Sequence, residues 1–155
     1  MPYDLLTIGH SNLQAERFMA LLTSAGVTAV ADVRSVPFSR WCPWFSGKAL
    51  AERLPASASP ISRWATPSAA ARAMRRFIAM GLPTTRPWPR DRNFAAGLAR
   101  VIDASARQRV CLLCAEREPL DCHRCLLVGR ALCERGLTLG HIRPDGTIEP
   151  HAATE

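Results

Sequence analysis

Four short apolar runs, separated by segments with helical periodicity, constrain what this chain can fold into more than any other feature. The runs are DLLTI (4–8), VTAVADV (27–33), RVCLLCA (109–115) and LTLGHI (137–142). Each run has the length and composition of a buried strand. Between the first two runs, apolar residues recur at i, i+3, i+4 and i+7 (Phe18, Leu21, Leu22 and Ala25), which predicts an amphipathic helix over 12–25. Strands that alternate with helices predict a compact three-layer α/β domain with a mostly parallel sheet.

Capping signals mark the ends of the predicted helices. Ser11, followed three residues later by Gln14, forms a capping-box pattern at the start of the first helix. Gly26 is suited to end that helix, because glycine tolerates the left-handed conformation of a helix C-terminus. Ser46 is placed to cap a short helix that runs through Leu54.

The C-terminal half continues the same alternation. Apolar periodicity predicts a helix at about 92–105 and another over 123–135, which Gly136 ends. The run at 137–142 is expected to be the last strand. It is followed by a turn at Pro144-Asp145-Gly146 and a short tail, TIEPH.

Length and composition indicate one soluble domain. At 155 residues the chain is long enough to bury a core, and we expect a single domain over 1–151 with a tail at 152–155. No apolar run approaches the 18 or so residues of a membrane span, and the N-terminus lacks the pattern of a signal peptide. We therefore expect a cytoplasmic protein whose six cysteines are thiols.

The net charge of +7 is concentrated in one segment. Residues 55–90 contain six arginines and no acidic residue, so they supply +6, while the rest of the chain has 14 basic against 13 acidic residues. Half of the twelve prolines also fall in this segment. A basic charge invites a nucleic-acid partner, but here that indication depends on 55–90 alone.

Polar residues gather where the predicted strands end. His10 follows the first strand, Asp32 and Arg34 end the second, and Cys114 and Glu116 end the third. In open α/β sheets, ligands bind in the crevice outside the C-terminal ends of the strands. The sequence thus predicts one site at that edge of the sheet.

Three motifs support a family resemblance. TIGHS near the N-terminus, DVRSVPFS after the second strand and CAEREPLDCHR before a late helix resemble the domain-of-unknown-function 488 family over about 1–54 and 91–151. The resemblance implies a compact α/β domain of bacteria and archaea with no established reaction. The positions that match the motifs are His10, Ser11, Asp32, Arg34, Pro37, Ser39, Cys114, Glu116, Cys122, His123 and Arg124.

Residues 55–90 depart from that family. Its members usually carry a tyrosine-containing strand, a Leu-Gly-Gly-Arg-like loop and a Tyr-Ala-Asp-Tyr-Met-like helix there. A back-translation of 60–88 that is shifted by one base restores a GGR loop and an ADYEAM helix. We therefore hypothesise a compensated frameshift across this segment. The alternative is a divergent insert, such as a basic lid over nucleic acid.

The cysteines of the third motif allow a redox or a metal site. Cys122 and Cys125 form C-x-x-C at a predicted helix start, where a thiolate is stabilised, although Cys125 also fits the core. Cys114, Cys122 and His123, with His10, offer a mixed sulfur and nitrogen site for zinc or iron. Neighbouring residues diverge by about 100° around a helix, which makes Cys122 and His123 an awkward ligand pair. The sequence requires no cofactor.

A polar site for a phosphate-bearing substrate is the leading interpretation. The candidate catalytic residues are His10, Asp32, Cys114, Glu116, Cys122 and His123, and the candidate substrate-binding residues are Ser11, Arg34, Ser39 and Arg124. Arginine forks suit phosphate, and the histidine and carboxylates suit proton transfer. We expect an enzyme that acts on a small phosphate-bearing ligand, such as a nucleotide, or on nucleic acid, with no membrane partner.

Other functions and purely structural roles remain open. A non-catalytic nucleic-acid or ligand-binding module and a metal- or redox-responsive protein are the alternatives. Individually, His10 could satisfy a loop carbonyl, and Cys114 could be a small core residue. Trp41, Trp44 and Phe45 could stack on bases, although such a cluster more often covers a core edge.

Overall fold

A computed structural model describes residues 2–34, 38–54, 59–61, 92–119 and 128–154. The side chains of 59–61 and 92–94 are outside that description. The candidates Cys122, His123 and Arg124 lie outside the described residues, as do Pro37 and most of the divergent segment.

The order of the described elements follows the predicted alternation. They are β1 (Leu5–Gly9), α1 (Ala15–Ser24), β2 (Ala29–Asp32), the 3₁₀ turn η1 (Pro43–Phe45), α2 (Gly47–Arg53), β3 (Ser59–Ile61), α4 (Arg92–Ser105), β4 (Val110–Cys114), α5 (Arg130–Cys133), β5 (Leu139–Ile142), β6 (Ile148–Pro150) and α6 (His151–Thr154). All four strands expected from the apolar runs are present, and the helix predicted at 92–105 is α4.

The described strands form one six-stranded sheet in the order β3-β2-β4-β1-β5-β6. All neighbouring pairs are parallel except β5 with β6. The central strand β1 aligns Leu6 with Cys111 of β4 on one side and with Gly140 of β5 on the other. The mostly parallel α/β sheet is therefore confirmed. Pro60 is tolerated in β3 because that strand lies at the edge of the sheet that the described residues form.

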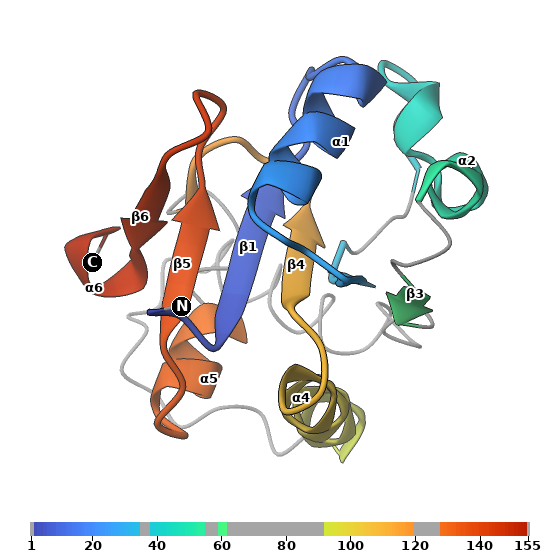
Figure 1. Cartoon of the computed structure of the whole chain (residues 1–155). Coiled ribbons are helices and arrows are strands. Elements are labelled where there is room, and N and C mark those ends of the chain that lie inside the picture. Colours follow the sequence, from blue (N-terminus) through green and yellow to red (C-terminus); the bar gives the residue numbers. More distant parts are fainter. Residues whose placement is uncertain (1, 35–37, 55–58, 62–91, 120–127, 155) are drawn as a thin grey trace, which may run out of the picture.

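Two hydrophobic clusters, one on each face of the sheet, make the fold a three-layer sandwich. One cluster joins the sheet to α4 and α5 through residues such as Leu112, Leu98 and Leu132. The other joins it to α1, η1 and α2 through residues such as Leu113 and Phe18. Figure 1 shows α1 and α2 on one side of the sheet and α4 and α5 on the other. Every residue of β4 is buried, but successive side chains join opposite clusters, because neighbouring side chains of a strand point to opposite faces.

Helix ends follow the sequence signals in two places and differ in a third. Ser46 caps α2, since its Oγ accepts a hydrogen bond from the Ala49 amide at 3.4 Å. Gly26, which follows the C-cap residue Ala25 of α1, has φ +67° as expected of a helix-ending glycine. The capping box was wrong: Gln14 is the N-cap of α1, and it makes no side-chain capping bond.

The C-terminal segment is more ordered than the predicted tail. Residues 148–150 form β6, which pairs antiparallel with β5, and His151 begins the short helix α6. The prediction that β5 would be the last strand was wrong. TIEPH is too short, polar and proline-containing to show the apolar pattern of a strand.

Buried contacts fasten this segment to the centre of the sheet. Thr7 Oγ1 lies 2.6 Å from His141 Nδ1, and His141 Nε2 lies 3.0 Å from His151 Nδ1. All three residues are buried. Next to them, β5 passes so close to its neighbours that a Cβ added at Gly140 would lie 2.6 Å from Ile148 Cγ2 and 2.8 Å from Tyr3 Cδ2. Only glycine leaves room for these contacts.

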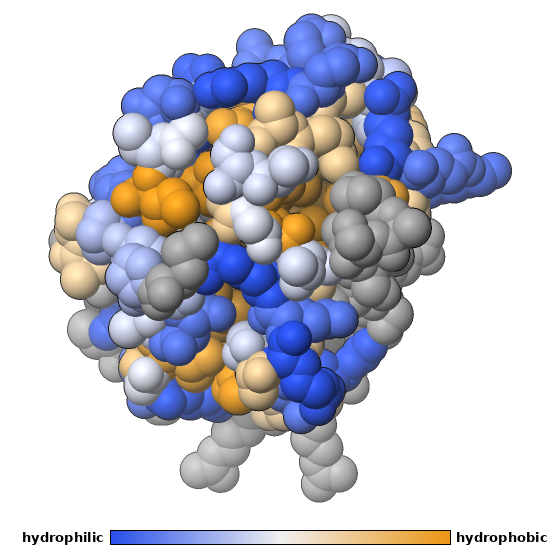
Figure 2. Space-filling model, in the orientation of Figure 1, coloured by the Kyte–Doolittle hydropathy of each residue, from blue (hydrophilic) through white to orange (hydrophobic). Residues whose placement is uncertain are grey.

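Hydrophilic residues cover most of the upper part of the surface, over α1 and α2, with smaller apolar patches among them (Figure 2). Among the described residues, no helix is both long enough and apolar enough to cross a membrane.

Candidate functional site

The predicted site lies where the sheet changes the direction of its connections. β1 and β4 are parallel neighbours. The chain leaves β1 for α1 on one face, whereas the chain after β4 leads to α5 on the opposite face. Loops that leave adjacent strands in opposite directions open a crevice at their C-terminal ends, which is the usual ligand position in such sheets. His10 and Cys114 stand at the two sides of this point.

The position of His10 is fixed by backbone and ring contacts. Its amide donates to the Cys114 carbonyl at 2.9 Å, which continues the pairing of β1 with β4. Its imidazole stacks on Phe45, with ring centroids 4.5 Å apart. Nδ1 lies 2.9 Å from the Ser11 carbonyl oxygen. A carbonyl can only accept, so Nδ1 carries the proton and Nε2 carries the lone pair.

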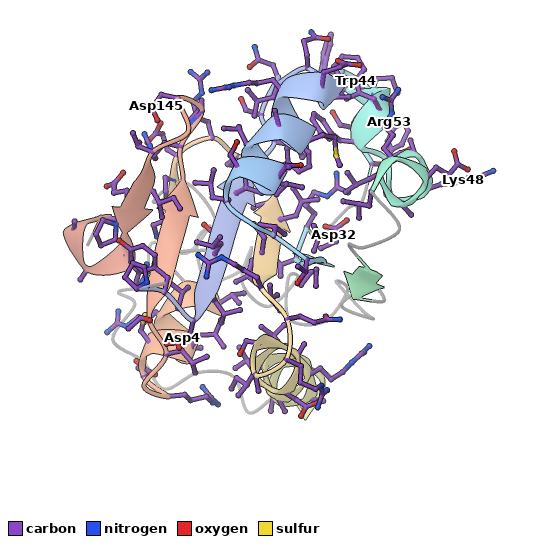
Figure 3. All side chains as sticks on the ribbon, viewed as in Figure 1. Asp4, Asp32, Trp44, Lys48, Arg53 and Asp145 are labelled. Atoms are coloured by element: carbon purple, nitrogen blue, oxygen red, sulfur yellow. The ribbon has the colours of Figure 1, made fainter. Side chains whose placement is uncertain are left out.

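Arg34 forms the other side of the imidazole environment. Its Nη1 lies 3.4 Å from His10 Nε2 and donates to the Phe45 carbonyl at 2.7 Å. Its Nε and Nη2 donate to Oδ1 and Oδ2 of Asp32 at 2.8 and 2.6 Å. The Arg34 side chain is only 2% exposed and that of Asp32 16%, so this bidentate pair is largely buried. Figure 3 shows Asp32 beside the ends of the strands, below α2.

These contacts determine the charge state of His10. Burial is the main cause that lowers the pKa of His10 below its usual value of 6.5, and the positive charge of Arg34 acts in the same direction. The hydrogen bond to the Ser11 carbonyl and the carboxylates of Asp32 and Glu116 oppose that shift. The imidazole is therefore neutral at neutral pH, in the tautomer that leaves Nε2 as an acceptor.

Ser11 holds an unusual backbone conformation at the same place. Its φ is +45°, and among the described residues other than glycine no other φ is positive. Its amide donates to the Ala115 carbonyl at 2.8 Å, and its carbonyl accepts the hydrogen bond from His10 Nδ1. A non-glycine residue pays a conformational cost for a positive φ, and such residues cluster at functional sites. The strained turn aims the carbonyl that fixes the His10 tautomer.

Cys114 and Glu116 line the β4 side. Glu116 Oε2 lies 2.6 Å from Cys114 Sγ. Cys114 is disulfide-bonded, so its sulfur has no proton to donate, and this contact is a close approach rather than a hydrogen bond. Cys42, Cys111 and Cys133, by contrast, are thiols. The expectation of six thiols was therefore wrong at Cys114.

The predicted residues divide into those that the structure brings together and those that it leaves apart. His10, Ser11, Asp32, Arg34, Cys114 and Glu116 meet at one edge of the sheet. Ser39 instead stabilises its own loop, where its Oγ accepts from the Cys42 amide at 3.1 Å. Among the described residues, no three potential metal ligands cluster. That search omits Cys122 and His123, so the zinc or iron hypothesis stays untested.

Phe45 contributes to the site in a way that the sequence analysis missed. It stacks on His10 and accepts from Arg34 through its carbonyl, while its own ring is buried. Sequence spacing gives no signal for this role, because Phe45 is far from His10 along the chain. The aromatic loop that follows β2 was the available clue, and it was interpreted as a core edge. For Phe45 and the partly buried Trp44 that interpretation is confirmed, whereas for Trp41, which faces solvent, it was wrong.

The chain was compared with known families and proteins. The family model described as "Domain of unknown function DUF488" matches residues 14–131. The chain belongs to this family. The DUF488 match spans Asp32, Arg34, Cys114 and Glu116, whereas His10 and Ser11 precede it. It also runs across 55–90, which the motif resemblance left out. No match was found among curated proteins or among solved structures.

Proposed function

We propose that this DUF488 protein is a cytoplasmic enzyme that acts on a phosphate-bearing substrate, a nucleotide or nucleic acid, with His10 as its general base. The observation that carries the proposal is a neutral imidazole of defined tautomer at the point where the sheet connections diverge. A general base must be deprotonated at the working pH, and burial provides that for His10.

Arg34 is a positioning residue in this proposal. Four of its N–H groups are directed at Asp32, Phe45 and His10, which suits a group that holds the base in place. The 3.4 Å separation from His10 Nε2 is long for a hydrogen bond, so a substrate hydroxyl or a water can replace this contact at little cost. The sequence assigns anion binding to Arg34 and Arg124. Because Arg34 is already engaged by Asp32 and Phe45, anion binding in this proposal falls mainly to Arg124.

Glu116 is the second proton carrier. It stands on the β4 side of the same edge, and its charge acts on the His10 imidazole. Asp32 is less suited to proton transfer, because both of its oxygens accept from Arg34. What supports a phosphate-bearing substrate is the CHR sequence at 122–124, with a guanidinium that matches phosphate oxygens.

The test is hydrolysis of bis(p-nitrophenyl) phosphate and of mixed ribonucleotides by the purified chain. The wild type is expected to turn over one of these probes, and His10→Gln is expected to lose activity by about 10²- to 10⁴-fold, as general-base removal does. Glu116→Gln should show a smaller loss with an altered pH profile. Turnover that is unchanged in His10→Gln, or no turnover of any probe, contradicts the proposal.

A second candidate, a redox-responsive protein, is favoured by the disulfide of Cys114 at this edge. Reduction would free its sulfur beside the Glu116 carboxylate. Peptide mass mapping of protein alkylated with and without reductant tests this candidate. Protection of Cys114 from alkylation only before reduction supports it, and equal alkylation in both samples counts against it.

A further inference from the structure

Two large apolar side chains of the loop after β2 face solvent. Trp41 is 79% exposed and Phe38 is 59% exposed, and they are the exposed large hydrophobics of the described residues. Single exposed apolar residues are common on protein surfaces. Two aromatic rings within four positions are less expected, because the other aromatic residues of this loop turn inward.

The loop that presents them is anchored at several points. The Cys42 amide donates to Ser39 Oγ at 3.1 Å, and Cys42 itself is buried. Trp44 Nε1 donates to the Leu13 carbonyl at 3.1 Å, and the Phe45 carbonyl is held by Arg34. A ligand that uses Trp41 therefore meets a ring whose supporting backbone is already ordered, which reduces the entropy cost of binding.

Basic side chains occur in the same loop and in the helix that follows it. The guanidinium of Arg40 lies over Trp41, 5.1 Å from the ring centroid. Lys48, on the first turn of α2, projects away from the body of the molecule, and Arg53 lies further along that helix (Figure 3). Residues 38–54 thus hold three basic side chains (Arg40, Lys48 and Arg53) against one acidic side chain, Glu52.

We propose that this surface, made of Phe38, Arg40, Trp41 and Lys48, binds single-stranded nucleic acid. Unpaired bases expose the flat faces that stack on aromatic rings, and neighbouring basic groups hold the phosphates. A duplex hides those faces. Lys48 is exposed, and an exposed lysine fits a polyanion better than a protein partner, since lysine is depleted in protein interfaces.

The bound nucleic acid would run from this surface toward the sheet edge that holds His10, because the loop that carries the surface begins where β2 ends. This inference rests on the proposed function only for the direction in which the nucleic acid continues beyond the surface. Binding at Trp41 itself requires no chemistry at His10, so the two ideas can fail separately.

The experiment measures fluorescence anisotropy of a labelled, mixed-sequence single-stranded DNA of about 16 nucleotides, a length within the range that single-strand-binding folds cover. Trp41→Ala is expected to weaken binding by roughly 5- to 150-fold, the range for loss of one stacked base. Trp41→Phe should retain most of the affinity, because it keeps a ring. Circular dichroism confirms that each variant is folded.

Charge variants have a matched control on the opposite face. Arg40→Gln and Lys48→Gln should each reduce the salt dependence, the slope of log K against log salt, by about 0.7. Arg107→Gln, in the turn that follows α4, changes the net charge equally and should leave that slope unchanged. The six arginines of 55–90 can add affinity for any nucleic acid to every variant. The test therefore depends on the differences in affinity and in slope between variants.

His10→Gln separates this inference from the proposed function. It should bind the oligonucleotide as the wild type does, even if all phosphate-ester turnover is lost. Equal affinity of Trp41→Ala and wild type overturns the inference, as does equal affinity for the same sequence as a duplex. Self-association of the wild type through Trp41, without oligonucleotide binding, overturns it as well.

Discussion

At the scale of single residues, Arg34 is the residue whose hydrogen bonds depend most on the chemistry of its side chain. A lysine could supply the charge, but only the planar guanidinium reaches both Asp32 oxygens while donating to Phe45. The sequence indicated that Asp32 and Arg34 stand at a strand end. It did not indicate that they bond to each other, because residues two apart in an extended strand normally share a side without meeting.

Removal of Arg34 should destabilise the fold strongly. Arg34→Ala leaves the Asp32 carboxylate without its buried partner, so the free energy of unfolding is expected to fall by about 3–5 kcal/mol. Arg34→Lys should lose less. Urea denaturation measures both. The matched control is Arg107→Ala, which breaks an ion pair whose side chains are 67% and 68% exposed and should cost less than about 1 kcal/mol. Similar losses for the buried and the exposed pair would contradict the buried bidentate geometry.

His10 should make stability depend on pH. Its pKa is lower in the folded protein than the value of 6.5 of an ordinary histidine, mainly through burial, so just below pH 6.5 the unfolded chain binds more protons. The contribution of His10 is therefore present above pH 6.5 and is lost as the pH falls toward the folded pKa. Unfolding free energies measured across this range should fall less steeply in His10→Gln. Parallel curves for the two proteins would refute this.

At the scale of elements, the four long strands were predictable, and the short ones were not. Apolar runs identify β1, β2, β4 and β5, because these strands are covered on both faces. β6 has three partly or fully exposed residues, so it carries no apolar signature. Ser11 failed as a cap because its backbone bonds to the chain that leaves β4, a contact that local sequence cannot reveal.

The β5–β6 hairpin should be sensitive to one methyl group. Gly140→Ala places a Cβ within 3 Å of Ile148 and Tyr3, so side chains or backbone must shift, at an expected cost of about 1–3 kcal/mol. Thermal unfolding measures the loss. In a double-mutant cycle with Ile148→Ala, the combined cost should be smaller than the sum of the single costs. Strict additivity would mean that the two residues do not compete for the same space.

At the scale of the whole molecule, the edge that gathers the site followed from topology rather than from any motif. A parallel sheet brings its strand ends to one side, which placed His10, Arg34 and Glu116 together before any contact was known. Strand order is another matter. Nothing local indicated that β1 would lie between β4 and β5, and this order decides which loops diverge.

The divergent segment gives a prediction for the whole chain. If 55–90 is a frameshift product, replacing 60–88 with the family-like, one-base-shifted sequence should raise the melting temperature, by roughly 2–4 °C if it adds about 1 kcal/mol. Differential scanning calorimetry of the two chains measures this. The gene sequence across these codons is the direct check. A lower melting temperature, or DNA in which no single-base shift encodes the family pattern, rules the hypothesis out.

The place of β1 also has a consequence during synthesis. The ribosome makes this strand before α1, β2 and α4, and before both of its partners, β4 and β5. Until those residues have been synthesised, β1 is an apolar strand with both edges unpaired. Chains with such exposed edges associate wrongly or bind chaperones. The centre of the sheet can therefore form only after β5 has been synthesised, and chains that stop before β5 should be targets for degradation.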